Sequence, residues 1–298
     1  MRKMNSYSMT TVVALYAIVV LMPTIAHGDI FVISSGNGTV GKYTNSGDAL
    51  GTTLITGLGN PTGIAVSGSD IFVTGYDAAI SEYTTSGTAV SIPLISNAFP
   101  QHLALSGSDL FVTNNFNNSV DEYTTSGSTV KKPLVDIPGQ ANGIAVSGID
   151  LFVTDTINGR IDEYTTSGAI VANPDLVSGL SAPIGIAVSG SNLFVVNNIS
   201  GLIGEYTTSG VAVNTALISG LDSPTGIALF GPDLFVTNSG SGTVGEYTTS
   251  GTTINADLIS GLNTPSDIVV TPVPRTFGFV AGLTVLSVLL FKRHNRAC

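Results

Sequence analysis

Short apolar runs recur along the chain at a nearly constant interval. The intervals between them are 41, 39, 41, 42 and 41 residues. Two further strings, Glu-Tyr-Thr-Thr-Ser-Gly and Gly-Ile-Ala-(Val or Leu), recur with the same period. Residues 29–271 therefore consist of six copies of one unit of about 40 residues. The apolar string is Asp-(Ile or Leu)-Phe-Val, and it begins at Asp29, Asp70, Asp109, Asp150 and Asp233, with Asn192 in the remaining place.

Within a unit, the apolar and polar positions predict four short strands. In the last copy these are residues 233–237, 243–248, 252–259 and 267–271. Each segment is rich in β-branched or aromatic residues and is bounded by Gly, Pro, Asn or Ser, and no helical periodicity lies between them. The Thr-Thr-Ser-Gly string between the second and third of these segments is typical of a hairpin, because glycine accepts a left-handed backbone.

Four strands in about 40 residues predict a blade of a β-propeller. The fold class is therefore all-β, a six-bladed propeller with four-stranded blades. The Phe-Val runs are apolar on both faces, as a sheet stacked between two neighbours requires. The alternative is a parallel β-solenoid, which would need shorter coils. Small side chains also suit the narrow axis of a propeller, and they recur at Ala65, Ala104, Ala145, Ala187 and Ala228.

The repeats resemble the NHL-repeat and streptogramin-lyase-like propellers. The likeness is clearest at residues 153–164, Val-Thr-Asp-Thr-Ile-Asn-Gly-Arg-Ile-Asp-Glu-Tyr, and at residues 183–188, Pro-Ile-Gly-Ile-Ala-Val. The resemblance implies that the Gly-Ile-Ala-Val segment is the innermost strand and begins each blade. This chain begins instead with a second strand. The first blade is therefore expected to take its inner strand from residues 267–271, a 3+1 closure that leaves no free inner edge.

The N-terminal segment has the pattern of a secretory signal peptide. Arg2 and Lys3 precede an apolar run at residues 11–26, and small residues precede Asp29, the expected first residue after cleavage. We therefore expect residues 1–28 to be a signal peptide. The alternative is a retained N-terminal anchor.

The C-terminal segment, residues 272–298, has the pattern of a membrane anchor. An apolar run at 276–291 predicts a transmembrane helix, and Lys292 and Arg293 then mark the cytoplasmic side. The segment resembles the PEP-CTERM sorting signals of Gram-negative bacteria, although Arg275 stands where that motif has an acid. The resemblance implies a sorting or processing enzyme as a partner and a place at the cell surface, in the periplasm or in the outer matrix. A plain anchor is the alternative.

Charge excludes one class of partner. Only 10% of the residues are charged. Residues 29–271 hold all 20 acidic residues but only four basic ones, which gives a net formal charge of −16. Nucleic acid is therefore excluded as a partner, because phosphate binding needs clustered Lys and Arg. The single cysteine, Cys298, allows no internal disulfide.

The differences between copies gather in the loops before the inner strand and after the Phe-Val strand, which should share one mouth of the channel. The glutamate that is repeated in five copies is expected to be structural, because a single active site needs only one set of catalytic residues. These glutamates are Glu82, Glu122, Glu163, Glu205 and Glu246. A ligand should meet the variable face. The candidate ligand-binding residues at this mouth are Tyr76, Asp77, His102, Asn114, Asn142, Asp155, Asn197, Asn238 and Asp267.

Two kinds of chemistry at the mouth are considered. Asn114, Asp155, Asn197 and Asn238 have the side chains that bind Ca²⁺, as in the gluconolactonase-type propellers, although the same residues also cap strands. No cofactor or metal-loop motif is present, so no cofactor is predicted. Lyase chemistry would need a histidine. His102 is the only one between the two terminal segments, and Asp267 lies two blades away, too far for a simple dyad.

Three functions remain open from the sequence. The first is a non-enzymatic binding or scaffold module whose partner is a protein or a glycan at the cell surface. The second is a metal-dependent hydrolase or lyase at the channel mouth. The third is a purely structural surface or matrix protein, consistent with near-identical repeats rich in Ser, Thr and Gly.

Overall fold

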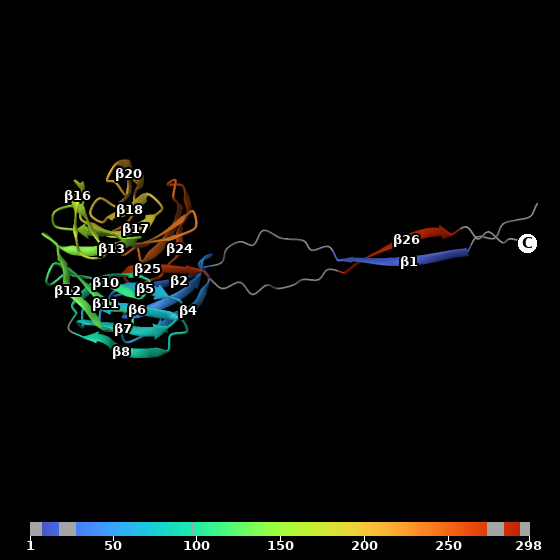
Figure 1. Ribbon diagram of the computed structural model, residues 1–298, viewed down its shortest axis with the longest axis horizontal. Coiled ribbons are helices and arrows are strands. Elements are labelled where there is room, and N and C mark those ends of the chain that lie inside the picture. Colours follow the sequence, from blue (N-terminus) through green and yellow to red (C-terminus); the bar gives the residue numbers. More distant parts are fainter. Residues whose placement is uncertain (1–7, 18–27, 97, 273–282, 293–298) are drawn as a thin grey trace, which may run out of the picture. The chain divides into compact units, whose positions relative to one another are not determined.

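The propeller predicted from the repeats is confirmed. The computed structural model describes residues 8–17, 28–96, 98–272 and 283–292. Between residues 28 and 272 the described chain forms six four-stranded antiparallel sheets, arranged as blades around one axis (Figure 1). Each blade has its first strand at the axis and its fourth strand at the rim. The 3+1 closure is also confirmed, because the last strand of the propeller completes the first blade.

The blades are numbered in chain order, with strands given from the axis outward. Blade 1 contains β25 (Pro265–Pro272), β2 (Gly28–Ser34), β3 (Thr39–Thr44) and β4 (Ala49–Ile55). Blade 2 contains β5 (Pro61–Ser67), β6 (Asp70–Gly75), β7 (Ala79–Thr84) and β8 (Ala89–Ser96). Blade 3 contains β9 (Pro100–Ser106), β10 (Asp109–Asn114), β11 (Ser119–Thr124) and β12 (Thr129–Asp136). Blade 4 contains β13 (Ala141–Ser147), β14 (Asp150–Asp155), β15 (Arg160–Thr165) and β16 (Ile170–Ser178). Blade 5 contains β17 (Pro183–Ser189), β18 (Asn192–Asn197), β19 (Leu202–Thr207) and β20 (Ala212–Ile218). Blade 6 contains β21 (Pro224–Phe230), β22 (Asp233–Asn238), β23 (Thr243–Thr248) and β24 (Thr253–Ile259).

The hydrophobic core is divided into layers between neighbouring blades. Side chains alternate across a strand, so the apolar string of β14 serves two layers. Leu151 and Val153 pack with Phe111 of blade 3, whereas Phe152 packs with Ile186 of blade 5. Fully burying a phenylalanine contributes about 1.5–3 kcal/mol. This explains why the apolar string recurs in every copy, and the buried phenylalanines are Phe31, Phe72, Phe111, Phe152, Phe194 and Phe235.

The Glu-Tyr-Thr-Thr-Ser-Gly string has a structural role in each blade. Its tyrosine lies in an inter-blade layer, as Tyr83 does beside Phe31. In the following turn, the Thr84 hydroxyl accepts a hydrogen bond from the Thr88 N–H at 3.1 Å. Gly87 has a φ of +85°, and a Cβ at this position would lie 2.5 Å from the carbonyl oxygen of Leu54 in blade 1. Glycine is therefore required both by the turn and by its contact with the neighbouring blade.

A buried threonine of the second strand connects adjacent inner strands. The Thr154 hydroxyl accepts a hydrogen bond from Gly143 N–H at 2.8 Å and donates one to the Ile184 carbonyl of blade 5 at 2.8 Å. Thr74 makes the same pair of bonds between blades 2 and 3. Blade 5 has Val196 at this place. The hydroxyl thus satisfies backbone groups at an irregularity in the sheet where no strand partner is available.

The segments outside the propeller form a separate unit. β1 (Ser8–Ala17) pairs with β26 (Leu283–Lys292) in an antiparallel sheet. The helix predicted over 276–291 is therefore replaced by a strand at 283–291, and residues 276–282 lie outside the described residues. An apolar run rich in Val, Leu and Thr suits either element, and pairing satisfies the backbone of both runs. Among the residues that the structure describes, no helix is long and apolar enough to cross a membrane.

We expect Thr154→Val to destabilise the propeller by about 1–3 kcal/mol, because the substitution leaves two buried backbone groups without a partner. For a protein of this size the melting temperature should fall by roughly 2–9 °C, measured by differential scanning calorimetry. Val196→Thr is the converse control. It places a hydroxyl beside Gly185 and should leave the melting temperature unchanged or raise it. Equal losses in both variants would contradict this role of the threonine.

Candidate functional site

The six inner strands surround a central channel. Each inner strand is adjacent to the next around the ring, from β25 through β5 and back to β21. The channel contains a cavity of about 320 Å³ with mainly aliphatic walls. One residue of each blade contributes to a ring around it, and these are Ile64, Leu103, Ile144, Ile186, Ile227 and Ile268.

The predicted mouth is present at one end of this channel. The loops before the inner strands and after the second strands share this face, as expected, and the Tyr76 N–H donates a hydrogen bond to the Asn60 carbonyl between them. A second cavity of about 350 Å³ opens here. Tyr76, His102 and Asn142 line it, so the structure brings these three predicted residues together. His102 also lines the channel cavity, as does Asp267.

A glycine begins the Gly-Ile-Ala segment in four of the six inner strands because the strands approach one another closely there. A Cβ on Gly143 would collide with the Ile184 carbonyl oxygen of the next blade. A Cβ on Gly63 would lie 2.9 Å from the Cα of His102. The other two blades have His102 and Asp267 at this position. These two side chains therefore interrupt an otherwise uniform ring.

Asp267 is a carboxylate in the wall of the channel. Its Oδ2 accepts a hydrogen bond from Ile64 N–H at 3.0 Å. Burial raises the pKa of Asp267, while the charge of His102 and the N–H groups of Ile64 and Ile268 lower it. No ion pair joins Asp267 to His102 among the described residues. They nevertheless share one cavity, on either side of Gly63.

His102 and Asn142 are buried without full hydrogen bonding. Each is only 8% exposed. Both ring nitrogens of His102 and the Oδ1 of Asn142 lack a hydrogen-bond partner. Each such group costs about 1–3 kcal/mol relative to a paired one. Unpaired groups are uncommon in protein interiors, so their concentration at the mouth marks a place where a ligand would be favourable.

The four residues considered for Ca²⁺ mostly bond within their own loops. The Oδ1 of Asn114 accepts bonds from Phe116 N–H and Asn117 N–H at 3.1 and 3.0 Å. The Oδ1 of Asn197 accepts from Ser181 N–H at 3.1 Å. Such turns are a common use of Asn and Asp after a strand. No group of three His, Cys, Asp or Glu side chains that could hold a metal ion is found within the described ranges.

Asp155 and Asn238 complete this set of four. The Oδ1 of Asp155 accepts from Gln140 N–H and Asn158 N–H, at 3.0 and 3.1 Å. Asn238 is almost fully buried and its Nδ2 donates to the Thr243 hydroxyl at 3.4 Å, while its Oδ1 has no partner. Neither residue lines the channel or mouth cavity. The exposed Asp77 lies in the turn after β6 and also lines neither of them.

A buried charge cluster in blade 4 was not anticipated. Arg160 lies among three carboxylates, with its Nε 3.2 Å from Asp155 Oδ2 and 2.9 Å from Asp162 Oδ1, and its guanidinium also pairs with Asp175. Neither oxygen of Asp162 accepts a hydrogen bond. Burial raises the pKa of Asp162 to about 7, although the charge of Arg160 lowers it. The signal in the sequence was Asp162 at a position where three other copies have glycine, such as Gly204, although blade 3 also has an aspartate there, Asp121.

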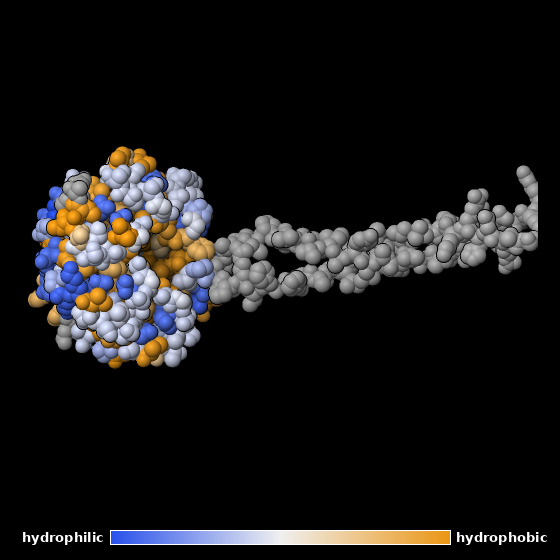
Figure 2. Space-filling model, viewed as in Figure 1, coloured by the Kyte–Doolittle hydropathy of each residue, from blue (hydrophilic) through white to orange (hydrophobic). Residues whose placement is uncertain are grey.

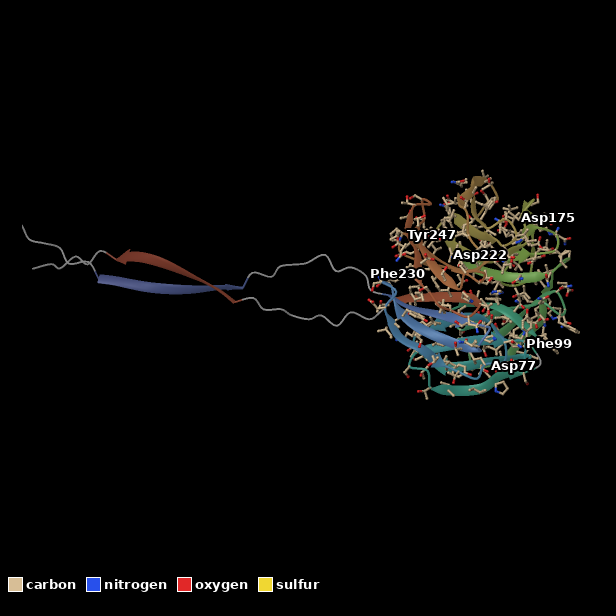
Figure 3. All side chains as sticks on the ribbon, turned by 180° about the vertical axis from the view of Figure 1, so that it is seen from behind. Asp77, Phe99, Asp175, Asp222, Phe230 and Tyr247 are labelled. Carbon is tan, nitrogen blue, oxygen red and sulfur yellow. The ribbon has the colours of Figure 1, made fainter. Side chains whose placement is uncertain are left out.

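Five exposed apolar side chains lie in the loops of the variable face, and sequence analysis proposed only Tyr76 among them as a candidate. Phe99 precedes β9 and Phe116 follows β10, and their rings stack with centroids 5.2 Å apart. Phe116 is 77% exposed. Figure 3 shows Phe99 and Asp77 on one side of the propeller and Phe230 on the other. We name the exposed residues of these loops the mouth patch: Tyr76, Phe99, Phe116, Ile157 and Ile199.

Known structures share this architecture. The chain is similar to a chain of the nidogen/laminin complex, with a TM-score of 0.70 and 16% identity over 82% of this chain and 98% of that one. It is also similar to a streptogramin B lyase, with a TM-score of 0.59 and 17% identity over 95% and 98%. The shared feature is the fold. No family model matches the sequence, and no curated protein matches it.

We expect Asp155→Ala to lower the melting temperature by several degrees in EDTA and in Ca²⁺ alike, because the carboxylate is used by backbone N–H groups and by Arg160. Calorimetric titration of Ca²⁺ with parallel thermal melts checks this. Asp222→Ala, an exposed carboxylate on the same face, is the control. A Ca²⁺-dependent rise in melting temperature that Asp155→Ala abolishes would instead support a metal site.

Asp162 should make stability depend on pH. Its pKa is about 7 when folded and near 3.8 when unfolded. The folded state therefore holds the proton more tightly, and stability is lost as the pH rises from about 4 to about 7. Between pH 5 and pH 8 the free energy of unfolding of Asp162→Asn should rise relative to that of the native protein by on the order of 2 kcal/mol, which corresponds to roughly 5 °C in melting temperature. The control is Asp257→Asn, at an exposed position, whose melting temperature should change with pH in the same way as that of the native protein. If the melting temperature of Asp162→Asn also followed that of the native protein over this pH range, the assignment would be contradicted.

Proposed function

We propose that this protein is an exported binding module that docks another protein through the mouth patch. The mouth patch is the observation that carries the proposal. Exposed aromatic and aliphatic side chains grouped on one face are typical of protein–protein interfaces, where aromatic residues dominate the binding energy. Exposed apolar residues also occur elsewhere on the surface (Figure 2), among them Val90 and Ile92 on the outermost strand of blade 2.

The other face of the propeller supports this assignment. Its turns repeat nearly the same Ser-Gly and Thr-Thr-Ser-Gly sequences in every blade. The propeller also begins and ends on this face, since Gly28 pairs with Pro272 and lies beside Phe230. A tether at the C-terminal end would therefore join the propeller on the face opposite the mouth patch. This arrangement suits a protein that is anchored at one end and binds at the other.

The fold is compatible with either binding or catalysis. A propeller of this architecture occurs in the nidogen/laminin complex, and another is a streptogramin B lyase. We favour binding because the mouth patch is aromatic and exposed. A hydrolase or lyase remains the alternative, and in that case His102 would be the general acid or base, since no other histidine lies within the described residues.

A photo-crosslinking residue in place of Ile157 should give one discrete protein adduct in the producing cells, whereas the same residue at Ile149 should give none. Ile157 and Ile149 are 73% and 69% exposed but lie on opposite faces. Adding Phe99→Ser and Phe116→Ser should remove the Ile157 adduct. The adducts are detected by denaturing electrophoresis and mass spectrometry.

The outcomes separate the three functions. An adduct whose added mass is removed by glycosidase identifies a glycan partner instead of a protein. Equal adducts from both faces would contradict docking through the mouth patch. The absence of any adduct would favour a purely structural protein.

A further inference from the structure

We propose that the channel mouth binds a primary ammonium group, held by Asp267 between the side chains of His102 and Asn142. The inference deepens the proposed function and rests on it in one respect, because the side chain of a lysine in the protein partner is one source of that group. A free alkylamine is the other source. The two share the chemistry of a compact cation with three N–H donors.

Asp267 supplies the charge. No other carboxylate lines the channel or mouth cavity within the described chain. It has part of its surface on the channel and accepts a hydrogen bond from Ile64 N–H. No ion pair within 4.0 Å reaches it among the described residues, although the charge of His102 lowers its pKa. A carboxylate enclosed by aliphatic walls is costly unless it is paired. A cation in the channel would relieve this cost and would itself be attracted by the formal charge of −16 on residues 29–271.

His102 and Asn142 supply hydrogen-bond acceptors. The His102 ring nitrogens and the Asn142 Oδ1 are buried without partners. A neutral imidazole has one acceptor nitrogen, and an amide oxygen has two lone pairs. Together with Asp267 this gives three acceptor groups for three ammonium hydrogens. An ammonium ion drawn to Asp267 would allow small side-chain rotations to pair these groups.

The cavities also suit a short alkyl chain. The mouth cavity of about 350 Å³ has Pro61 and Ile184 in its walls, beside His102 and Asn142. An alkyl stem would therefore lie against the apolar walls of the mouth with the charged end toward Asp267, which is the way long cationic side chains bury their stems.

The experiment is a calorimetric titration of n-butylammonium into the full chain. Tetramethylammonium, which has the charge but no N–H, and butan-1-ol, which has the chain but no charge, are the ligand controls. Asp267→Gly and His102→Gly restore the glycine of the other blades, so both variants should fold, and thermal melts check this. Asp222→Asn removes an exposed carboxylate from the same face and is the matched control variant.

We expect saturable one-site binding of n-butylammonium by the native chain and by Asp222→Asn. Affinity should fall at least tenfold in Asp267→Gly, less in His102→Gly, and should be absent for both control ligands. Equal binding by the native chain and Asp267→Gly would overturn the proposal, since it would reflect general surface charge. Binding of tetramethylammonium with equal affinity would overturn the hydrogen-bonding role of the acceptors.

Two peptides distinguish the source of the ammonium group. A lysine-containing peptide that competes with n-butylammonium, when its N-acetyl-lysine form does not, identifies a lysine side chain as a ligand. Competition by neither peptide identifies a free amine. If n-butylammonium does not bind but the Ile157 adduct forms, only this inference is refuted. If n-butylammonium binds but no Ile157 adduct forms, protein docking is refuted and the site is assigned to a free amine.

Discussion

The pairing of β25 with β2 is the interaction on which the rest of the propeller depends. It joins the last strand of the ring to the first blade, from Gly28 opposite Pro272 to Ser34 opposite Pro265. The hydrophobic layer between blades 6 and 1 contains Ile268 from β25 and Ile30 from β2. Without this pairing the layer is lost and the ring opens. The channel, the mouth and the approach of neighbouring inner strands all require a closed ring.

The sequence specified the repeating part of the structure well. The period and the apolar string predicted the blades because each buried position recurs in every copy and serves the same inter-blade layer. Phe152 and Tyr164, for example, are buried in equivalent layers on opposite faces of one blade. The 3+1 closure also followed, because a chain that begins with a second strand needs its missing inner strand from the other end.

The sequence was a weaker guide where one residue type has several uses. Asn114 and Asp155 have the chemistry of Ca²⁺ ligands, but the same oxygen atoms satisfy backbone N–H groups in tight turns, and only the positions of those groups separate the two. The charge cluster around Arg160 joins side chains from β14, β15 and β16, so Asp162 at a position that is glycine in other copies marks the place but does not reveal its partners. At the chain ends, an apolar run fits a helix or a strand, and its partner lies far away in sequence.

The features that distinguish this propeller lie at the positions where one copy differs from the repeat. Asp267 and His102 replace glycines of the inner ring, and Phe99 immediately precedes the strand that carries His102. The near-identical copies form a regular ring, so a side chain that differs from the repeat is present in one blade and has no equivalent in the others. One departure can therefore create a single site in a ring of six similar units.

The position of the two ends determines how the propeller would respond to force. Gly28 and Pro272 face each other across the closing pair, so tension between the two ends would act across the hydrogen bonds of β2 and β25 one after another, beginning at this pair. Such peeling meets less resistance than sliding two strands past each other, because few bonds share the load at any moment. If only the C-terminal end is held, the load enters the propeller through β25, and the ring would open where this strand closes blade 1.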